Sequence, residues 1–242
     1  MAGNFKMMAK TLYGFEPILA KELRDLGAGH VEEGVRNVTF EGDTGFMYKA
    51  NLCLRTALKV FKPIKTFRVF NENDLYRHIF DLNWPDIFDV EKTFAIDSIA
   101  NTEVFDNTMF VSLKAKDAIV DKFREVVRER PNVKTQDPDI RINIHIYKNT
   151  CTVSLDSSGN SLHQRGYRIL TNIAPINEVL AAGLLLKSGW DGQTDFFDPM
   201  CGSGTFLIEA AMIACNIPVN INRESYAFMH WKDYDAELYD KI

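Results

Sequence analysis

Residues 195–214 constrain the fold more than any other stretch, and they read DFFDPMCGSGTFLIEAAMIA. An apolar run ends in Asp-Pro, a glycine loop follows, and an apolar segment of helical character comes next. This order predicts a short strand, a tight loop and a helix. The first N–H groups of such a helix point outward and its dipole adds partial positive charge, so the loop is a potential site for an anion or a polar group. We expect Gly202 and Gly204 to let the backbone approach that ligand closely.

Three classes of cofactor use this geometry, and the sequence disfavours two of them. A phosphate-binding P-loop requires GxxxxGK[ST], and no lysine stands at that position. A dinucleotide-binding loop normally has GxGxxG, and GSGTFL lacks the third glycine. S-adenosylmethionine remains, because its methionine carboxylate can accept hydrogen bonds from the loop N–H groups. A GxG pair alone also occurs in turns that bind nothing, so the hypothesis depends on the whole of DPMCGSGT between strand and helix.

Length and composition indicate a soluble protein with more than one domain. The chain has 242 residues, of which 46% are hydrophobic, enough for two cores. No run approaches the ~20 apolar residues of a membrane-spanning helix, and the first residues lack the apolar region of a signal peptide. The cysteines show no metal-binding spacing; they are Cys53, Cys151, Cys201 and Cys215. We therefore expect a cytoplasmic protein with reduced, buried thiols, no membrane association and no metal.

Charge is distributed unevenly along the chain. The net charge is -5, which by itself argues against a nucleic-acid partner. Residues 111–168, however, hold 11 Lys and Arg against 7 Asp and Glu, whereas residues 169–242 hold 4 against 10. A basic middle and an acidic end suggest two separate tasks. The alternative, that these are ordinary solvated helix faces, remains open from charge alone.

Apolar spacing predicts an α+β arrangement over residues 9–159. The expected order is a strand, a helix and a strand over 9–42, a helix over 44–61, a strand at 65–70, a helix at 72–80, a strand at 92–100, a helix at 112–130, and two strands joined by a hairpin at Lys148-Asn149. The helix at 112–130 has a predicted buried stripe of Val111, Ala115, Ile119, Phe123 and Val126. Its basic residues lie mostly elsewhere, which predicts a basic surface.

The amino-acid composition changes after Asp156. Residues 157–175 are rich in Ser, Gly and Asn and contain Arg165 and Arg168, which indicates a connector between domains. A helix is expected after Pro175, ending at Gly189, followed by the strand TDFFD, the loop and the helix of residues 205–214.

These segments resemble a known enzyme family. DPMCGSGTFLIEAA is similar to the cofactor motif of Rossmann-like methyltransferases that modify exocyclic amines of nucleic-acid bases. LHQRGYR followed by APINEVLAAGLLLKSGWDG looks like the join after a THUMP RNA-binding domain, and TLYGFEPILAKELRDLGA and NLCLRTALKVFKPIKTF extend the match. Together they resemble bacterial THUMP-containing 23S ribosomal RNA guanine-N2 methyltransferases, often described as N6-adenine-specific DNA methylases.

The resemblance implies an α+β ferredoxin-like and THUMP region followed by the start of an α/β Rossmann-like methyltransferase domain dependent on S-adenosylmethionine. The implied boundaries are 1–62 for the ferredoxin-like domain, 63–157 for THUMP, 158–174 for a linker and 175–242 for the methyltransferase start. The implied cofactor residues are Asp198, Pro199, Cys201, Gly202, Ser203, Gly204 and Thr205. Pro175, Asn177 and Glu178 either brace the cofactor or begin a helix, and Cys201 is expected to pack rather than to act as a nucleophile.

The resemblance also implies RNA, most of all large-subunit ribosomal RNA, as the partner. The implied RNA-binding residues are Lys114, Lys116, Lys122, Arg124, Arg165 and Arg168. For the two connector arginines, Arg165 and Arg168, fixing the linker is an equal alternative.

The sequence departs from the family in one respect. Related amine methyltransferases carry Asn/Asp-Pro-Pro-Tyr, which aims the target amine at the methyl group, and this motif does not occur here. We therefore expect no catalytic side chain before Ile242, and a parent enzyme of which this chain alone is inactive. Two alternatives stay open. One is an RNA-binding module without catalysis, and the other is a methyltransferase that acts on adenine N6 in DNA or on transfer RNA.

Overall fold

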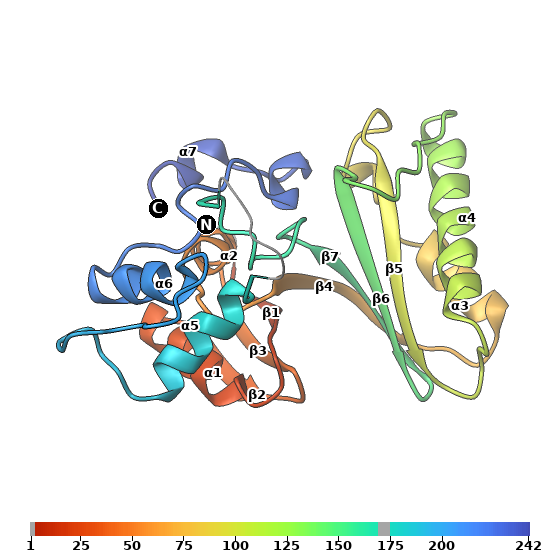
Figure 1. Cartoon of the computed structure of the whole chain (residues 1–242). Coiled ribbons are helices and arrows are strands. Elements are labelled where there is room, and N and C mark those ends of the chain that lie inside the picture. Colours follow the sequence, from red (N-terminus) through yellow and green to blue (C-terminus); the bar gives the residue numbers. More distant parts are fainter. Residues whose placement is uncertain (1–2, 169–174) are drawn as a thin grey trace. The chain divides into compact units, whose positions relative to one another are not determined.

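The computed structural model describes residues 3–168 and 175–242, and the chain divides into two compact units. Unit 1 comprises Met1–Phe61, Asn160–Ser225 and Glu237–Ile242, and unit 2 comprises Lys62–Gly159 and Tyr226–Ala236. The chain thus passes from one unit to the other four times. Each unit is described separately below, with the element labels of Figure 1.

Unit 1 begins with an antiparallel sheet covered by helices (Figure 1). Its first elements are β1 (Phe5–Lys10), α1 (Glu16–Leu26), β2 (Gly29–Glu33), β3 (Asn37–Gly42) and α2 (Thr44–Cys53). The strand order is β2-β3-β1, and the start of β4 (Lys59–Arg68) pairs with β1. Helix α1 buries Leu19 and Leu23 and ends at Gly27, whose φ of 101° closes the helix in the left-handed region.

The helix predicted over residues 44–61 is wrong in its second half. Helix α2 ends at Cys53, Leu54 is extended, and Lys59–Phe61 form the first part of β4. Val60 and Phe61 pair with Ala9 and Met8 across an antiparallel ladder. The free edge of β1 therefore determines the conformation of these residues, and their apolar spacing fitted either element.

The second part of unit 1 contains α5 (Glu178–Lys187) and α6 (Thr205–Ala214), which pack against each other. Asn177 caps α5 by accepting a hydrogen bond from the Leu180 N–H at 3.1 Å, which confirms a helix-start role for this residue. Gly183 faces Phe15, and a Cβ there would lie 2.1 Å from its ring. This close approach explains a glycine in the middle of α5. The short helix α7 (Ala236–Tyr239) follows near the end.

The predicted strand TDFFD is not a strand. Residues 195–198 are irregular, and Phe197 and Met200 are 84% and 90% exposed. A strand requires a ladder of hydrogen bonds to a neighbour, and no described segment pairs with this one. The apolar run therefore reaches the loop as an unpaired segment.

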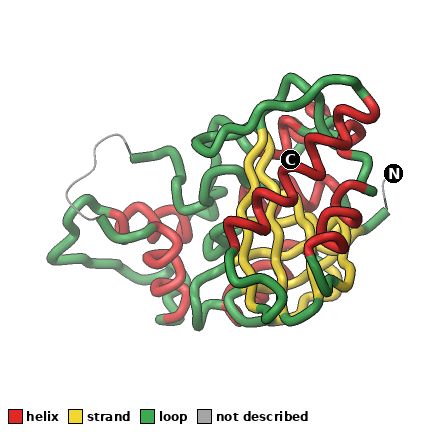
Figure 2. The backbone as a smooth tube through the Cα atoms, turned by 90° about the vertical axis from the view of Figure 1, so that its right-hand side faces the viewer, coloured by secondary structure: helices red, strands yellow, loops and turns green. Residues whose placement is uncertain are grey.

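Unit 2 contains a four-stranded sheet in the order β4-β7-β6-β5 (Figure 1). Figure 2 shows the strands of the protein in yellow and its helices in red. Its elements are the main part of β4, α3 (Glu72–Phe80), the short 3-10 helix η1 (Trp84–Asp86), β5 (Phe94–Asn101), α4 (Thr108–Val126), β6 (Ile140–Tyr147), β7 (Thr150–Asp156) and η2 (Ala227–His230). Strands β5 and β6 are parallel, and β6 and β7 form an antiparallel hairpin. Helices α3 and α4 lie side by side, and α4 packs on β5.

The core of unit 2 follows the predicted patterns closely. Strand β6 buries every second residue, and the turn at Lys148-Asn149 confirms the predicted hairpin. Four members of the predicted α4 stripe are buried, namely Val111, Ala115, Ile119 and Phe123. The fifth, Val126, is about half exposed, because α4 ends at that residue.

A segment from far along the chain completes unit 2. Residues 226–236 return to it, and the Phe228 N–H donates to the Ser157 carbonyl at 3.1 Å. Phe228 and Trp231 are buried there, and Lys62 donates to Asp233 at 2.9 Å. The sheet of unit 2 is therefore covered in part by residues that the resemblance assigned to the methyltransferase region.

The four cysteines are free, but not all are buried as expected. Burial raises the pKa of Cys151 to about 12, whereas Cys201 and Cys215 are exposed. Across residues 3–168 and 175–242, no helix combines the length and apolar character needed to cross a bilayer.

Candidate functional site

The glycine loop forms a tight turn at the N-terminus of α6. The Gly204 N–H donates to the Cys201 carbonyl at 2.8 Å, and the Ile208 N–H donates to the Gly204 carbonyl at 2.9 Å. Gly202 and Gly204 have φ values of 55° and 75°, and an added Cβ at either would meet no atom within 4 Å. Their backbone conformation, rather than a lack of space, is therefore what this structure shows to require glycine.

Unpaired N–H groups make the loop a place for an anionic group. Within the described residues, the backbone N–H groups of Gly202, Ser203 and Thr205 make no hydrogen bond. They lie where the dipole of α6 contributes partial positive charge. The loop can therefore donate several hydrogen bonds to one carboxylate.

Arg168 fastens this loop to the start of α5. Its Nη2 donates to Thr205 Oγ1 at 3.0 Å and its Nη1 to Ser203 Oγ at 3.2 Å. The same guanidinium donates to Glu178 Oε1 from Nε at 3.1 Å and from Nη2 at 2.8 Å. Both charged side chains are largely buried, at 15% and 9% exposed. The structure thus brings Arg168, predicted to contact RNA or fix the linker, to the predicted cofactor loop.

The residues just before the loop are open to solvent. Asp198 accepts a hydrogen bond from the Met200 N–H at 3.0 Å, so this carboxylate shapes the turn that follows Pro199. Cys201 is exposed, and its Sγ lies 3.9 Å from the Gly202 carbonyl oxygen. The expectation that Cys201 packs in the interior is therefore wrong. The reason is that, among the residues that the structure describes, no strand pairs beside the loop to bury it.

Arg165 lies in the interior of unit 1. Its guanidinium donates to the Leu162 carbonyl at 2.9 Å and to the Arg55 carbonyl at 2.6 Å, and it lies 3.5 Å from Glu209. Burial raises the pKa of Glu209, and the nearby Arg165 acts in the opposite direction. Tyr167 donates to the same carboxylate at 3.0 Å. Of its two predicted roles, Arg165 is therefore placed to fix the connector rather than to contact RNA.

An open cavity of about 430 Å³ lies between the connector and α5. It is lined by residues 163–168 and 175–178, including Arg168 and Glu178. The connector arginine that holds the loop is thus also a wall of a cavity.

The four predicted RNA-binding residues of α4 all have acidic partners. The ion pairs are Lys114–Glu72 at 3.6 Å, Lys116–Asp117 at 2.5 Å, Lys122–Glu125 at 2.7 Å and Arg124–Asp121 at 3.2 Å. The face is therefore less basic than the sequence count indicates. Exposed pairs of this kind contribute only ~0–1 kcal/mol, so their cations remain able to exchange partners.

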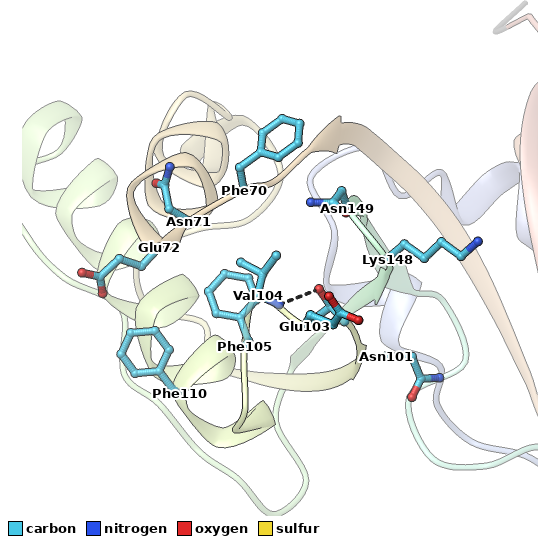
Figure 3. Close-up of a pocket in the computed structure, with 11 residues that line it drawn as sticks. Phe70, Asn71, Glu72, Asn101, Glu103, Val104, Phe105, Phe110, Lys148 and Asn149 are labelled. Carbon is cyan, nitrogen blue, oxygen red and sulfur yellow. Dashed lines mark hydrogen bonds between the residues drawn. The ribbon is translucent and has the colours of Figure 1, made fainter.

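A second, larger cavity of about 1080 Å³ lies in unit 2, and sequence reasoning missed it (Figure 3). Its lining is Phe70, Asn71, Glu72, Asn101, Thr102, Glu103, Val104, Phe105, Phe110, Lys148 and Asn149. The sequence feature that could have pointed to this cavity is an asparagine that follows an aromatic or basic residue. It occurs at two turns, in Phe70-Asn71 and Lys148-Asn149. In the part of the chain that the structure describes, no group of three or more His, Cys, Asp or Glu could hold a metal ion.

Three domain families match the chain in succession. Residues 6–61 match the RlmL ferredoxin-like domain, residues 69–156 match the THUMP domain, and residues 165–240 match the RMKL-like methyltransferase domain. The glycine loop therefore lies in the region that matches the methyltransferase domain, and unit 2 contains the region that matches the THUMP domain. The expected fold class is confirmed.

Similar proteins agree with this assignment. The chain is 43% identical to the ribosomal RNA large subunit methyltransferase K/L of Psychromonas ingrahamii, over 96% of this chain and 31% of the relative. Among solved structures, it is similar to a predicted N6-adenine-specific DNA methylase from Listeria monocytogenes, with a TM-score of 0.88 and 30% identity. That match covers 99% of this chain and 62% of the other.

A third similar protein, the methyltransferase candidate SMU.472, was crystallised with SAH. The TM-score is 0.85 and the identity 32%, over 100% of this chain and 63% of the other. In succession, the chain thus matches an RlmL ferredoxin-like domain, a THUMP domain and an RMKL-like methyltransferase domain, and it is similar to these relatives. It spans less than two thirds of the length of each of these relatives.

Proposed function

We propose that the protein is an S-adenosylmethionine-dependent methyltransferase that acts on the N2 amine of a guanine in large-subunit ribosomal RNA. The observation that carries the proposal is the loop of Gly202–Thr205 at the start of α6. Among the described residues its Gly202, Ser203 and Thr205 N–H groups make no hydrogen bond, while Arg168 joins the loop to Glu178. The SAH bound by one structural relative and the name of the 43% identical protein support the cofactor and the substrate.

Each part of the loop has a role in binding the cofactor. The N–H groups of Gly202, Ser203 and Thr205 donate to the methionine carboxylate, because all three are unpaired among the described residues and lie at a helix N-terminus. Asp198 has a carboxylate oxygen left to accept from the cofactor's amino group, since one oxygen already binds the Met200 N–H. S-adenosylmethionine supplies the methyl group on its sulfonium when bound. The chain's own residues hold it in place.

The other part of the proposal concerns RNA. The THUMP domain supplies the surface on which RNA is held while the amine is positioned, and orientation of the two reactants is the main requirement of such a transfer. Lys114, Lys116, Lys122 and Arg124 are the proposed phosphate contacts on α4. Arg168 serves the loop, and Arg165 fixes the connector.

A calorimetric titration with S-adenosylhomocysteine tests the cofactor site. We compare the unsubstituted protein with Gly202→Asp and with the matched control Gly189→Asp. Both glycines have positive φ and open space, so the backbone cost is similar, but only position 202 lies in the loop. We expect at least tenfold weaker binding for Gly202→Asp, because its carboxylate repels that of the ligand. Equal affinities for the two variants, or no binding by the unsubstituted protein, would refute the site.

A second candidate function is RNA binding without catalysis by this chain. The observation that favours it is the exposure of Phe197 and Met200 beside a loop next to which no strand of the described ranges pairs. In that case RNA binds with an affinity that falls steeply as salt is added, and S-adenosylhomocysteine does not bind.

A further inference from the structure

The large cavity of unit 2 is built from four separate segments (Figure 3). They are the link between β4 and α3 with the first residue of α3, the end of β5 with the loop after it, the first turn of α4, and the turn of the β6–β7 hairpin. Asn101 and Tyr147 are paired at the ends of β5 and β6, and the Lys148 N–H donates to the Asn101 carbonyl at 2.8 Å. The hairpin turn is therefore held beside the loop after β5, and the cavity is part of the folded unit.

Two exposed aromatic rings line this cavity. Phe70 is 64% exposed and Phe110 is 41% exposed, whereas Phe105 is buried. Phe105 and Phe110 lie with ring centroids 6.3 Å apart. Burial of a Phe ring stabilises a protein, and an exposed ring does not make this contribution. A ring that stays exposed in a cavity is therefore available to stack on a flat ligand.

Asparagine side chains also line the cavity. Asn149 donates to the Val69 carbonyl at 3.3 Å, which leaves its Oδ1 as an acceptor. The side chain of Asn101 makes no hydrogen bond to any residue within 3–168 and 175–242. An asparagine amide offers both donors and an acceptor, so it can pair with the edge of a nucleobase. The Glu103 carboxylate, also in the lining, can accept from a base amino group.

Positive charge is present at the same rim. Lys148 is exposed at the hairpin turn, and its ammonium lies 5.6 Å from the ring centroid of Tyr147. Lys114 lies 3.6 Å from Glu72, a residue of the lining. An aromatic platform, free amides and an ammonium together are the groups that bind a base and its phosphate.

We propose that this cavity binds one unstacked base of a single-stranded RNA segment. Phe70 stacks on the base, Asn101 and Asn149 bind its edge, and Lys148 contacts a phosphate. The proposal rests on the proposed function in taking RNA as the partner, but it adds a site for a base to the phosphate contacts proposed along α4. An open cavity suits a base that remains joined to its strand on both sides.

The test is fluorescence anisotropy with a short, labelled single-stranded RNA of mixed sequence. We compare the unsubstituted protein with Phe70→Ala, Phe70→Trp and the control Tyr13→Ala, which removes an exposed ring in unit 1. Base stacking on an aromatic ring accounts for roughly tenfold in affinity per base. We expect Phe70→Ala to weaken binding about tenfold, Phe70→Trp to retain it, and Tyr13→Ala to leave it unchanged. Circular dichroism checks that each variant folds.

Blunt duplex RNA and S-adenosylhomocysteine separate failure of this inference from failure of the proposed function. Phe70→Ala should leave duplex binding unchanged, because paired bases cannot enter the cavity. Equal affinity of Phe70→Ala and unsubstituted protein for the single strand would overturn the inference, as would a loss for Tyr13→Ala of the same size. If the unsubstituted protein binds S-adenosylhomocysteine but no single strand, the base site is overturned while the cofactor site stands. If Lys122→Glu weakens binding of the single strand and Phe70→Ala does not, RNA is held by α4 and the base site is again overturned.

Discussion

The β6–β7 hairpin of unit 2 and residues 195–198 of unit 1 are both apolar runs, but only the hairpin forms paired strands. In the hairpin, Ile142, Ile144 and Ile146 are completely buried, and residues 142–147 of β6 each pair with a residue of β7. Residues 195–198 are irregular, and Phe197 is mostly exposed. The difference shows that apolar character makes a strand only where a partner strand satisfies the backbone groups.

The two regions also differ in what holds them. The hairpin is held by a backbone ladder and a core, whereas the glycine loop after residue 198 is held by the side chain of Arg168. A ladder spreads its stability over many bonds. The loop depends on a few bonds from one guanidinium, so single substitutions should affect the two regions very differently.

The largest expected effect comes from removing a buried side chain of the hairpin. Ile144→Ala should lower the free energy of unfolding of unit 2 by about 2–5 kcal/mol, because it leaves a cavity in the core. The matched change Phe197→Ala should cost less than about 0.5 kcal/mol, since that ring is already exposed. Chemical denaturation followed by the fluorescence of Trp84 and Trp231 measures the first change. Similar losses for both variants would contradict the comparison.

A smaller effect is expected when the loop loses its fastening. Arg168→Gln removes the ion pair to Glu178 and the bonds to Ser203 and Thr205, which should release the loop locally by about 1–3 kcal/mol. Hydrogen exchange of peptides covering residues 201–208 should become faster, while peptides of β6 remain protected. The control Arg124→Gln, which breaks an exposed pair, should change neither. Unchanged exchange in the loop would show that Arg168 does not hold it.

The smallest effect concerns Asp139, just before β6. Burial alone would raise the pKa of this carboxyl, but hydrogen bonds from the Thr93 hydroxyl and N–H, with the nearby His230, outweigh it and lower the pKa. A lowered folded-state pKa stabilises the protein at neutral pH, and this stability is lost as the pH falls through that pKa. Asp139→Asn should therefore cost about 1 kcal/mol at pH 7 and progressively less in acid. Urea titrations of both proteins at several pH values measure this difference in the free energy of unfolding. A difference that grows as the pH falls would contradict a lowered pKa of Asp139.

Elements that depend on neighbouring residues in the sequence could be predicted. Helix α3 over residues 72–80 and the hairpin at Lys148-Asn149 are confirmed because their hydrogen bonds are local. Residues 59–61 were placed in a helix because their partner, β1, lies about fifty residues earlier. The prediction of a strand at residues 195–198 is wrong for the same reason, because a sequence pattern does not show whether a neighbouring strand is there to pair with it.

The candidate site was predictable to a similar extent. Glycine spacing and the following helix located the loop, because both are local features. The contact of Arg168 with Ser203 and Thr205 joins residues more than thirty positions apart, and the cavity at Phe70 joins four segments. Neither has a local signature, so only the folded chain reveals them.

The return of residues 226–236 to unit 2 has a consequence for synthesis on the ribosome. Strands β5, β6 and β7 are all made before Asn160, yet Phe228 and Trp231, which are buried in the same unit, follow much later. At roughly 5–20 residues per second, the nascent sheet waits several seconds with part of its apolar surface uncovered. During that interval the emerging polypeptide presents a natural target for a chaperone, and the final residues of the segment end its exposure.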